Sequence, residues 1–162
     1  MKRMAASDYA RLAVSIALPL LVGFVGSLAT SKSVGTWYVN LDKPSFTPPG
    51  AVFGPVWTVL YVMMGVSLFL VWQKGLAAPN VKIGIAVFAV QMALNLLWSF
   101  AFFGARSPLA GAVVIVALWC AIMATVLVFA RVSQLAAWLL VPYLAWVSFA
   151  SVLNFSLYVL NK

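Results

Sequence analysis

The stretch PLAGAVVIVALWCAIMATVLVFA, residues 108–130, contains no charged side chain. A helix needs about 20 apolar residues to cross the roughly 30 Å hydrocarbon core of a bilayer, so this stretch is long enough to span a membrane. Ser107 and Pro108 at its start are typical of a helix N-cap and a first helical residue. The sequence therefore predicts a transmembrane helix here.

Four further apolar stretches accompany this one, separated by polar or Pro/Gly-bearing breaks. Their approximate limits are 9–30, 51–73, 82–104 and 135–160. The chain of 162 residues is 65% hydrophobic and 7% charged, far from the composition of ordinary soluble domains. We expect an all-α integral membrane protein, in which residues 1–162 form a single five-helix transmembrane bundle. Because every connection except residues 31–50 is short, neighbouring helices should be antiparallel.

The first apolar stretch could also be part of a signal peptide, because Ser27-Leu28-Ala29 resembles a cleavage site. However, the apolar run from Leu12 to Ala29 is longer than the usual core of a signal peptide. We therefore expect the first span to be retained.

The chain is basic, with a formal net charge of +8. Its basic residues are scattered near the ends of the apolar stretches, which argues against nucleic-acid binding and is typical of membrane anchors. Those on the N-terminal side are Lys2, Arg3, Arg11, Lys74, Lys82 and Arg131, and those on the opposite side are Lys32, Lys43, Arg106 and Lys162. The excess favours a cytoplasmic N-terminus. We expect a multi-pass protein, in a bacterial membrane rather than an organelle membrane.

Side chains for common catalytic and redox chemistry are scarce. The chain has no histidine, and its one cysteine, Cys120, lies in an apolar run, so a metal site or histidine-ligated haem is not expected. Asp8 and Asp42, the two carboxylates, fall at or outside the edges of the predicted spans. Because proton-coupled carriers usually rely on carboxylates inside the membrane, an active transporter is disfavoured.

Aromatic and amide side chains recur at helical spacing on one face of three spans. These faces comprise Trp57, Tyr61, Met64 and Leu68; Gln91, Asn95, Trp98 and Phe102; and Tyr143, Trp146, Ala150 and Asn154. From periodicity alone, the simpler interpretation is that they are interhelical packing seams. The position of these side chains along the spans favours a second interpretation. If the helices alternate in direction, many of these side chains fall in the half of the bundle nearest residues 31–50. This predicts a pocket capped by the long loop.

Several motifs resemble those of one membrane family, and together they cover most of the chain. They are Trp37-Tyr38, KPSFTPPG at 43–50, GPVW at 54–57, QMALNLLW at 91–98, FFGAR at 102–106, PYLAW at 142–146 and Leu153-Asn154. The sequence thus resembles the translocator protein family, also called tryptophan-rich sensory proteins or peripheral-type benzodiazepine receptors. The resemblance implies a five-helix bundle, often a dimer, that binds porphyrins such as protoporphyrin IX, cholesterol-like sterols, and benzodiazepine or isoquinoline carboxamide drugs.

The resemblance also implies site residues. Residues that match family pocket positions are Trp57, Asn95, Trp98, Trp146, Ala150 and Leu153, with Trp37 and Tyr38 in the lid; the periodic faces add Tyr61, Gln91 and Tyr143. The chain departs from the family at Phe46, where many relatives have tryptophan. It departs again at Phe155 and Val159, which replace the tyrosine and the basic residue of the animal sterol motif. These last departures put a sterol in doubt as the native ligand.

The leading hypothesis is a membrane receptor or sensor that binds a tetrapyrrole as a ligand, without an obligatory cofactor. The ligand would stack on Trp57 and Trp146, and its propionates would meet Lys32, Lys43 or Arg106. One alternative is a protein that degrades porphyrin with light and oxygen, through Trp57 and Trp146. Another is passive transport of porphyrin or sterol.

The expected partners are the lipid bilayer, the small-molecule ligand and, as a homodimer, a second copy of the chain. Two ridges of small residues could support such a dimer. They are Ala117, Ala121 and Thr125 in one span, and Ala89 and Ala93 in another.

Overall fold

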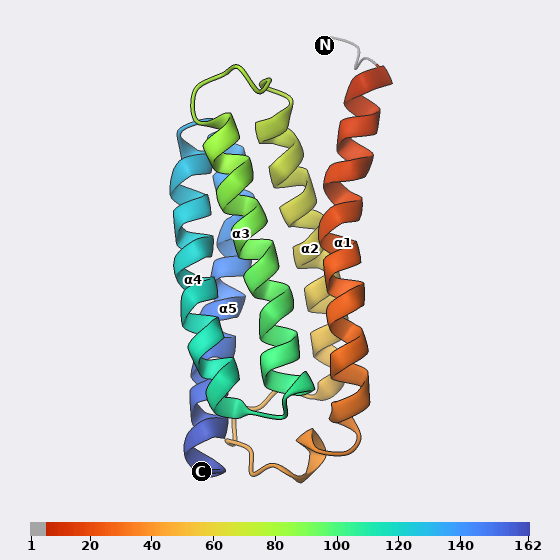
Figure 1. Ribbon diagram of the computed structural model, residues 1–162, viewed down its shortest axis with the longest axis vertical. Coiled ribbons are helices and arrows are strands. Elements are labelled where there is room, and N and C mark those ends of the chain that lie inside the picture. Colours follow the sequence, from red (N-terminus) through yellow and green to blue (C-terminus); the bar gives the residue numbers. More distant parts are fainter. Residues whose placement is uncertain (1–5) are drawn as a thin grey trace.

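The computed structural model describes residues 6–162, and its regular elements are all helices (Figure 1). In chain order they are α1 (Ala6–Val34), η1 (Tyr38–Asn40), α2 (Gly50–Trp72), α3 (Val81–Ser99), η2 (Phe100–Gly104), α4 (Pro108–Ala130) and α5 (Gln134–Leu160). With η2 continuing α3, five helices are long and apolar enough to cross a membrane. The predicted all-α membrane fold is confirmed. Lys2 and Arg3, which contributed to the prediction of topology, lie outside the described residues.

Serine caps fix where the last two helices begin. The Ser107 hydroxyl accepts the N–H of Ala110 at 3.1 Å, and Pro108 occupies the first turn of α4. In the same way, Ser133 accepts the N–H of Ala136 in front of α5. Both caps are visible in the sequence, because a serine precedes each apolar run.

α1 continues to Val34, beyond the end expected near residue 30. The serines at this end extend the helix instead of breaking it. Ser31 Oγ donates to the carbonyl of Leu28, and Ser33 Oγ donates to the carbonyl of Phe103 at 2.7 Å, which ties α1 to the end of η2. A polar residue that satisfies a carbonyl in this way is compatible with helix.

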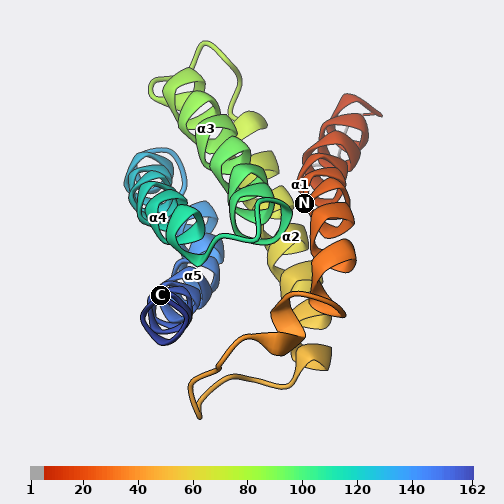
Figure 2. The same cartoon turned by 60° about the horizontal axis from the view of Figure 1, so that its bottom comes forward.

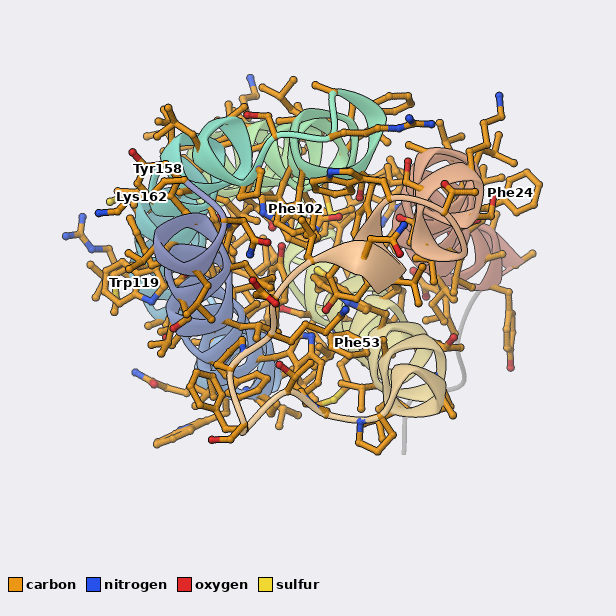
Figure 3. The ribbon with its side chains drawn as sticks, turned by 90° about the horizontal axis from the view of Figure 1, so that it is seen from below. Phe24, Phe53, Phe102, Trp119, Tyr158 and Lys162 are labelled. Carbon is orange, nitrogen blue, oxygen red and sulfur yellow. The ribbon has the colours of Figure 1, made fainter. Side chains whose placement is uncertain are left out.

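The helices alternate in direction. The N-terminal end of α1 and the loop before α5 therefore lie at one end of the bundle, and the long loop and Lys162 lie at the other end (Figure 1). α1 packs against α2 and α3, while α5 packs against α2 and α4. The long loop, residues 35–49, crosses beneath the bundle toward the C-terminal end of α5 and returns to α2 (Figures 2 and 3).

The end of the bundle away from the long loop is filled with apolar side chains. Phe88 stacks on Phe129, with ring centroids 5.9 Å apart, and Val71, Val81 and Leu140 are buried around them. Large apolar side chains also cover the outer surface, as expected when the surrounding solvent is lipid. The half nearest the loop is packed differently, because it contains a cavity.

Candidate functional site

A cavity of about 690 Å³ lies in the half of the bundle nearest the long loop. Its walls come from α1, α2, α3 with η2, α5 and the loop. Pockets for small molecules typically measure about 300–1,000 Å³ and are mostly apolar with a few placed polar groups. The cavity is therefore of a size that suits a flat ligand with several rings.

Two groups of aromatic rings lie where α2 meets α5. In one, Trp57 stacks on Tyr61 at 5.4 Å between centroids and meets Tyr143 edge-on at 6.1 Å. In the other, Phe53 meets Trp146 edge-on at 5.7 Å. Rings held at these distances keep fixed orientations and present flat apolar faces to the cavity.

A hydrogen-bonded chain centred on Asn95 crosses the inner end of the cavity. Tyr61 donates its hydroxyl proton to Asn95 Oδ1 at 2.9 Å, and Asn95 Nδ2 donates to the hydroxyl of Tyr143 at 2.9 Å. Asn95 is 2% exposed, and its bonds join α3 to α2 and α5. In a membrane, where water cannot satisfy a buried amide, such bonds fix how helices meet. The periodic faces therefore combine packing with the lining of a cavity.

A second buried amide positions Trp98. The indole N–H of Trp98 donates to Asn154 Oδ1 at 3.1 Å, and Asn154 Nδ2 donates to the carbonyl of Pro108 at 2.8 Å. Trp98 also stacks on Phe102 at 5.5 Å. The indole is thus held from α5 on one side and from η2 on the other.

The last turn before the α3–α4 connection, η2, is a π-helix. Its wider turn is closed by the N–H of Ala105, which donates to the carbonyl of Phe100 at 2.7 Å. Phe102 is 2% exposed, and its ring lies 5.5 Å from that of Trp37 and 6.2 Å from that of Tyr38. The π segment thus places a ring under the loop. The sequence contained no recognisable signal for it.

The loop is held over the cavity as a lid. The backbone N–H of Asp42 donates to Asn161 Oδ1, and Asn161 Nδ2 donates to the Asp42 carbonyl, both at 2.9 Å. Lys43 Nζ donates to the carbonyls of Val39 and Leu41, each at 3.0 Å, and lies 5.0 Å from the ring centroid of Tyr38. Burial raises the pKa of the Tyr38 phenol, so its hydroxyl stays protonated at neutral pH.

Most of the residues predicted from the sequence lie on this cavity. Those that line it are Tyr38, Lys43, Trp57, Tyr61, Asn95, Trp98, Trp146, Ala150 and Leu153. Trp37 packs behind the lid against Phe102, and the fully buried Tyr143 supports Trp57 and Asn95 from behind. Gln91 is 1% exposed, and among residues 6–162 neither of its amide atoms has a hydrogen-bond partner.

Two of the three predicted propionate contacts are not on the cavity wall. Lys32 lies in the last turn of α1, where it is exposed and does not line the cavity. Arg106 is exposed in the turn after η2, where its φ is +52°. Among the described lining residues, Lys43 alone carries a charge.

The contribution of α1 to the cavity was not predicted from the sequence. The lining side of α1 includes Gly23, Gly26, Ser27 and Thr30. Small residues at spacings of three and four in an otherwise bulky apolar helix were a signal that could have been read. Phe53 was missed as well, although it stands four residues before Trp57 and therefore on the same face of α2.

The small-residue ridges proposed for a dimer lie in different environments. In the ridge on α4, Thr125 is fully buried, Ala121 is half-buried and Ala117 is exposed, so only the Thr125 end faces into the bundle. Ala89 and Ala93 remain exposed on α3.

Comparison with known proteins gives consistent results over nearly the whole chain. Residues 15–160 match the sequence model of the TspO/MBR family. The chain is 53% identical over 150 residues to the tryptophan-rich protein TspO of Chlorobaculum tepidum, a match that covers 93% of this chain and 95% of that protein. It is 41% identical over 138 residues to the translocator protein of Homo sapiens, covering 85% and 82%. A tryptophan-rich sensory protein of Cereibacter sphaeroides is 36% identical over 125 residues, covering 77% of each chain.

Proposed function

Because this chain belongs to the TspO/MBR family, we propose that it is a membrane receptor or sensor that binds a protoporphyrin IX-like tetrapyrrole in the cavity under the lid. Family membership supports the broader role of a membrane sensor, receptor or transporter. The five spans make it a multi-pass integral membrane protein in contact with the lipid bilayer. The observation that carries the narrower proposal is the pairing of flat aromatic walls with one cation at the lid.

A tetrapyrrole is a large flat ring with an apolar face, and the cavity offers such a ring two aromatic surfaces. The ring would lie against the Trp57–Tyr61 stack and the Phe53–Trp146 pair. The indole of Trp146 lines the cavity, while its N–H is buried and has no hydrogen-bond partner within residues 6–162. Offset and edge-on contacts of this kind contribute about 0.5–1.5 kcal/mol each beyond simple burial.

The lid supplies the charge that an amphipathic acid needs. Lys43 uses two of its three N–H donors on lid carbonyls, which leaves one for a ligand carboxylate. A charge-assisted bond there would orient the propionate edge of a tetrapyrrole toward the lid. An uncharged drug or sterol would use the aromatic walls without this bond.

The proposal is tested by quenching of tryptophan fluorescence when protoporphyrin IX is added in the dark to the protein in lipid nanodiscs. Saturable quenching, weakened at least about threefold by Trp146→Phe, is expected because that change removes part of the ring face that lines the cavity. Nanodiscs without protein measure how much porphyrin dissolves in the lipid. Quenching that rises linearly and is the same in the variant would contradict the proposal.

Replacing Lys43 by Gln should weaken protoporphyrin IX binding about tenfold, because the carboxylate loses its charged partner. The dimethyl ester of the same porphyrin has no carboxylate, so its affinity should change by less than about twofold. Any distortion of the lid would affect both ligands alike. Arg106→Gln is the matched control, since Arg106 is exposed away from the cavity. Equal losses for acid and ester would argue against recognition of the carboxylate.

A further inference from the structure

The contact between α1 and α2 is very close at one level of the bundle. A methyl group built on Gly65 of α2 would lie 2.5 Å from the Cα atom of Ile16 and 2.7 Å from the carbonyl oxygen of Ser15. A methyl group built on Gly23 of α1 would overlap the ring of Tyr61. Glycines at such points allow two helix backbones, or a backbone and a ring, to touch. From Tyr61 toward the end of the bundle away from the lid, α1 and α2 therefore leave no gap between them.

Toward the lid, the same two helices separate. Methyl groups built on Gly50 and Gly54 would meet nothing within 4 Å. Both glycines line the cavity and are exposed, as are Ser27 and Thr58. Lining residues that remain this exposed lie where the wall of the cavity is open. We name this opening, bounded by Ser27 on α1 and by Gly54 and Thr58 on α2, the α1–α2 slit.

The slit reaches into the depth of the membrane-spanning helices. Thr58 is two turns beyond the start of α2 at Gly50, which places it about 12 Å along the helix at 1.5 Å per residue. Outside the slit, Phe24 of α1 is 63% exposed and points away from the bundle (Figure 3). An exposed phenylalanine at this level indicates that the outer rim meets lipid.

The polar groups on the rim do not need water. Ser27 Oγ donates to the carbonyl of Phe24 at 2.6 Å, and Thr58 Oγ1 donates to the carbonyl of Gly54 at 2.9 Å. Hydroxyls that are satisfied within their own helix can face hydrocarbon at low cost. At the lid, by contrast, the Asp42–Asn161 bonds hold the loop against α5.

We infer that the cavity opens sideways into the bilayer through the α1–α2 slit, and that its ligand is a membrane-dissolved molecule which enters and leaves edge-first by this route. This inference rests on the proposed function, since it describes how the ligand of that cavity arrives. A ligand that reaches the cavity this way is drawn from the lipid phase, and the lid does not have to open.

The test is a stopped-flow measurement of protoporphyrin IX binding to the protein in nanodiscs, with Ser27→Phe and Thr58→Phe as the blocking variants. Each places a ring in the slit, so both the association and the dissociation rate should fall at least about tenfold. The matched controls are Leu28→Phe and Val59→Phe, which are exposed neighbours outside the cavity lining and should keep wild-type rates. Rates in the blocking variants equal to those of the controls would overturn the inference.

A second experiment tests the alternative route under the lid by locking the lid in place with a disulfide. In a Cys120→Ser background, Asp42→Cys and Asn161→Cys replace the two residues whose hydrogen bonds hold the lid against α5, and formation of the disulfide is verified by mass spectrometry before and after reduction. Passage through the slit predicts the same rates in the oxidised and reduced protein. An oxidised protein that binds at least about tenfold more slowly would place the route under the lid and overturn the inference. Wild-type protein that shows no saturable binding would instead contradict the proposed function.

Discussion

Asn95→Leu is expected to weaken tetrapyrrole binding by about 10- to 100-fold and to lower the free energy of unfolding by about 1–3 kcal/mol. The leucine has a similar volume but cannot accept the Tyr61 proton or donate to the hydroxyl of Tyr143. Two buried hydroxyls would then lose their partner, and the Tyr61–Trp57 wall would lose the bond that holds it to α3. Binding is measured by dark fluorescence titration in nanodiscs, and stability by unfolding in mixed detergent micelles.

The chain offers a matched control one helical turn away. Gln91 is also a buried amide on the same face of α3, but it does not line the cavity and forms no hydrogen bond within residues 6–162. Replacing it by the isosteric Met removes an unsatisfied polar group, so stability should be unchanged or should rise, and ligand affinity should be unaffected. If Gln91→Met were as damaging as Asn95→Leu, the role assigned to the bonds of Asn95 would be wrong.

Gly65→Ala is expected to lower the free energy of unfolding by about 2–3 kcal/mol, because the added methyl group would force two helix backbones apart. The atoms it meets belong to the backbone of α1 at Ser15 and Ile16, which cannot rotate away as a side chain could. The higher helix propensity of alanine would offset only about 1 kcal/mol. Separation at this level should also widen the α1–α2 slit, so ligand release should become faster.

Gly50→Ala tests whether that effect comes from the close contact rather than from glycine itself. A methyl group at Gly50 meets nothing within 4 Å, so this substitution should change stability by less than about 0.5 kcal/mol. Thermal and detergent unfolding of both variants give the comparison. Equal effects at the two positions would mean that α1 and α2 are not in close contact at Gly65.

The number and extent of the spans could be predicted well, since each depends on local composition. Backbone polar groups inside the hydrocarbon core must form hydrogen bonds within a helix, and such a helix needs about 20 apolar residues to cross the core. Long apolar stretches in the sequence therefore indicate the spans directly. The serine caps at Ser107 and Ser133 are equally local. The end of α1 was missed because Ser33 is satisfied by a carbonyl of η2, far away in sequence.

The candidate site was predictable to the extent that helical periodicity and alternating direction determine face and depth. Trp57, Asn95, Trp98 and Ala150 could be assigned to the half nearest the loop for this reason, and they line one cavity. Periodicity could not rank the three candidate cations. The position of Lys43 depends on the path of the loop, which the Asp42–Asn161 bonds fix. The positions of Lys32 and Arg106 depend on how α1 and the turn after η2 are oriented in the bundle.

The sequence by itself determined that this protein lies in a lipid bilayer and crosses it five times, because both follow from hydrophobicity. It also determined which helix faces meet inside the bundle, because these follow from spacings of three and four residues. Only the tertiary structure decided that Lys43 is the cation on the cavity wall, that η2 turns Phe102 under the lid, and that α1 and α2 touch at Gly65 but separate at Gly54. These features depend on angles and contacts between residues far apart in the chain. Local pattern contains no information about them.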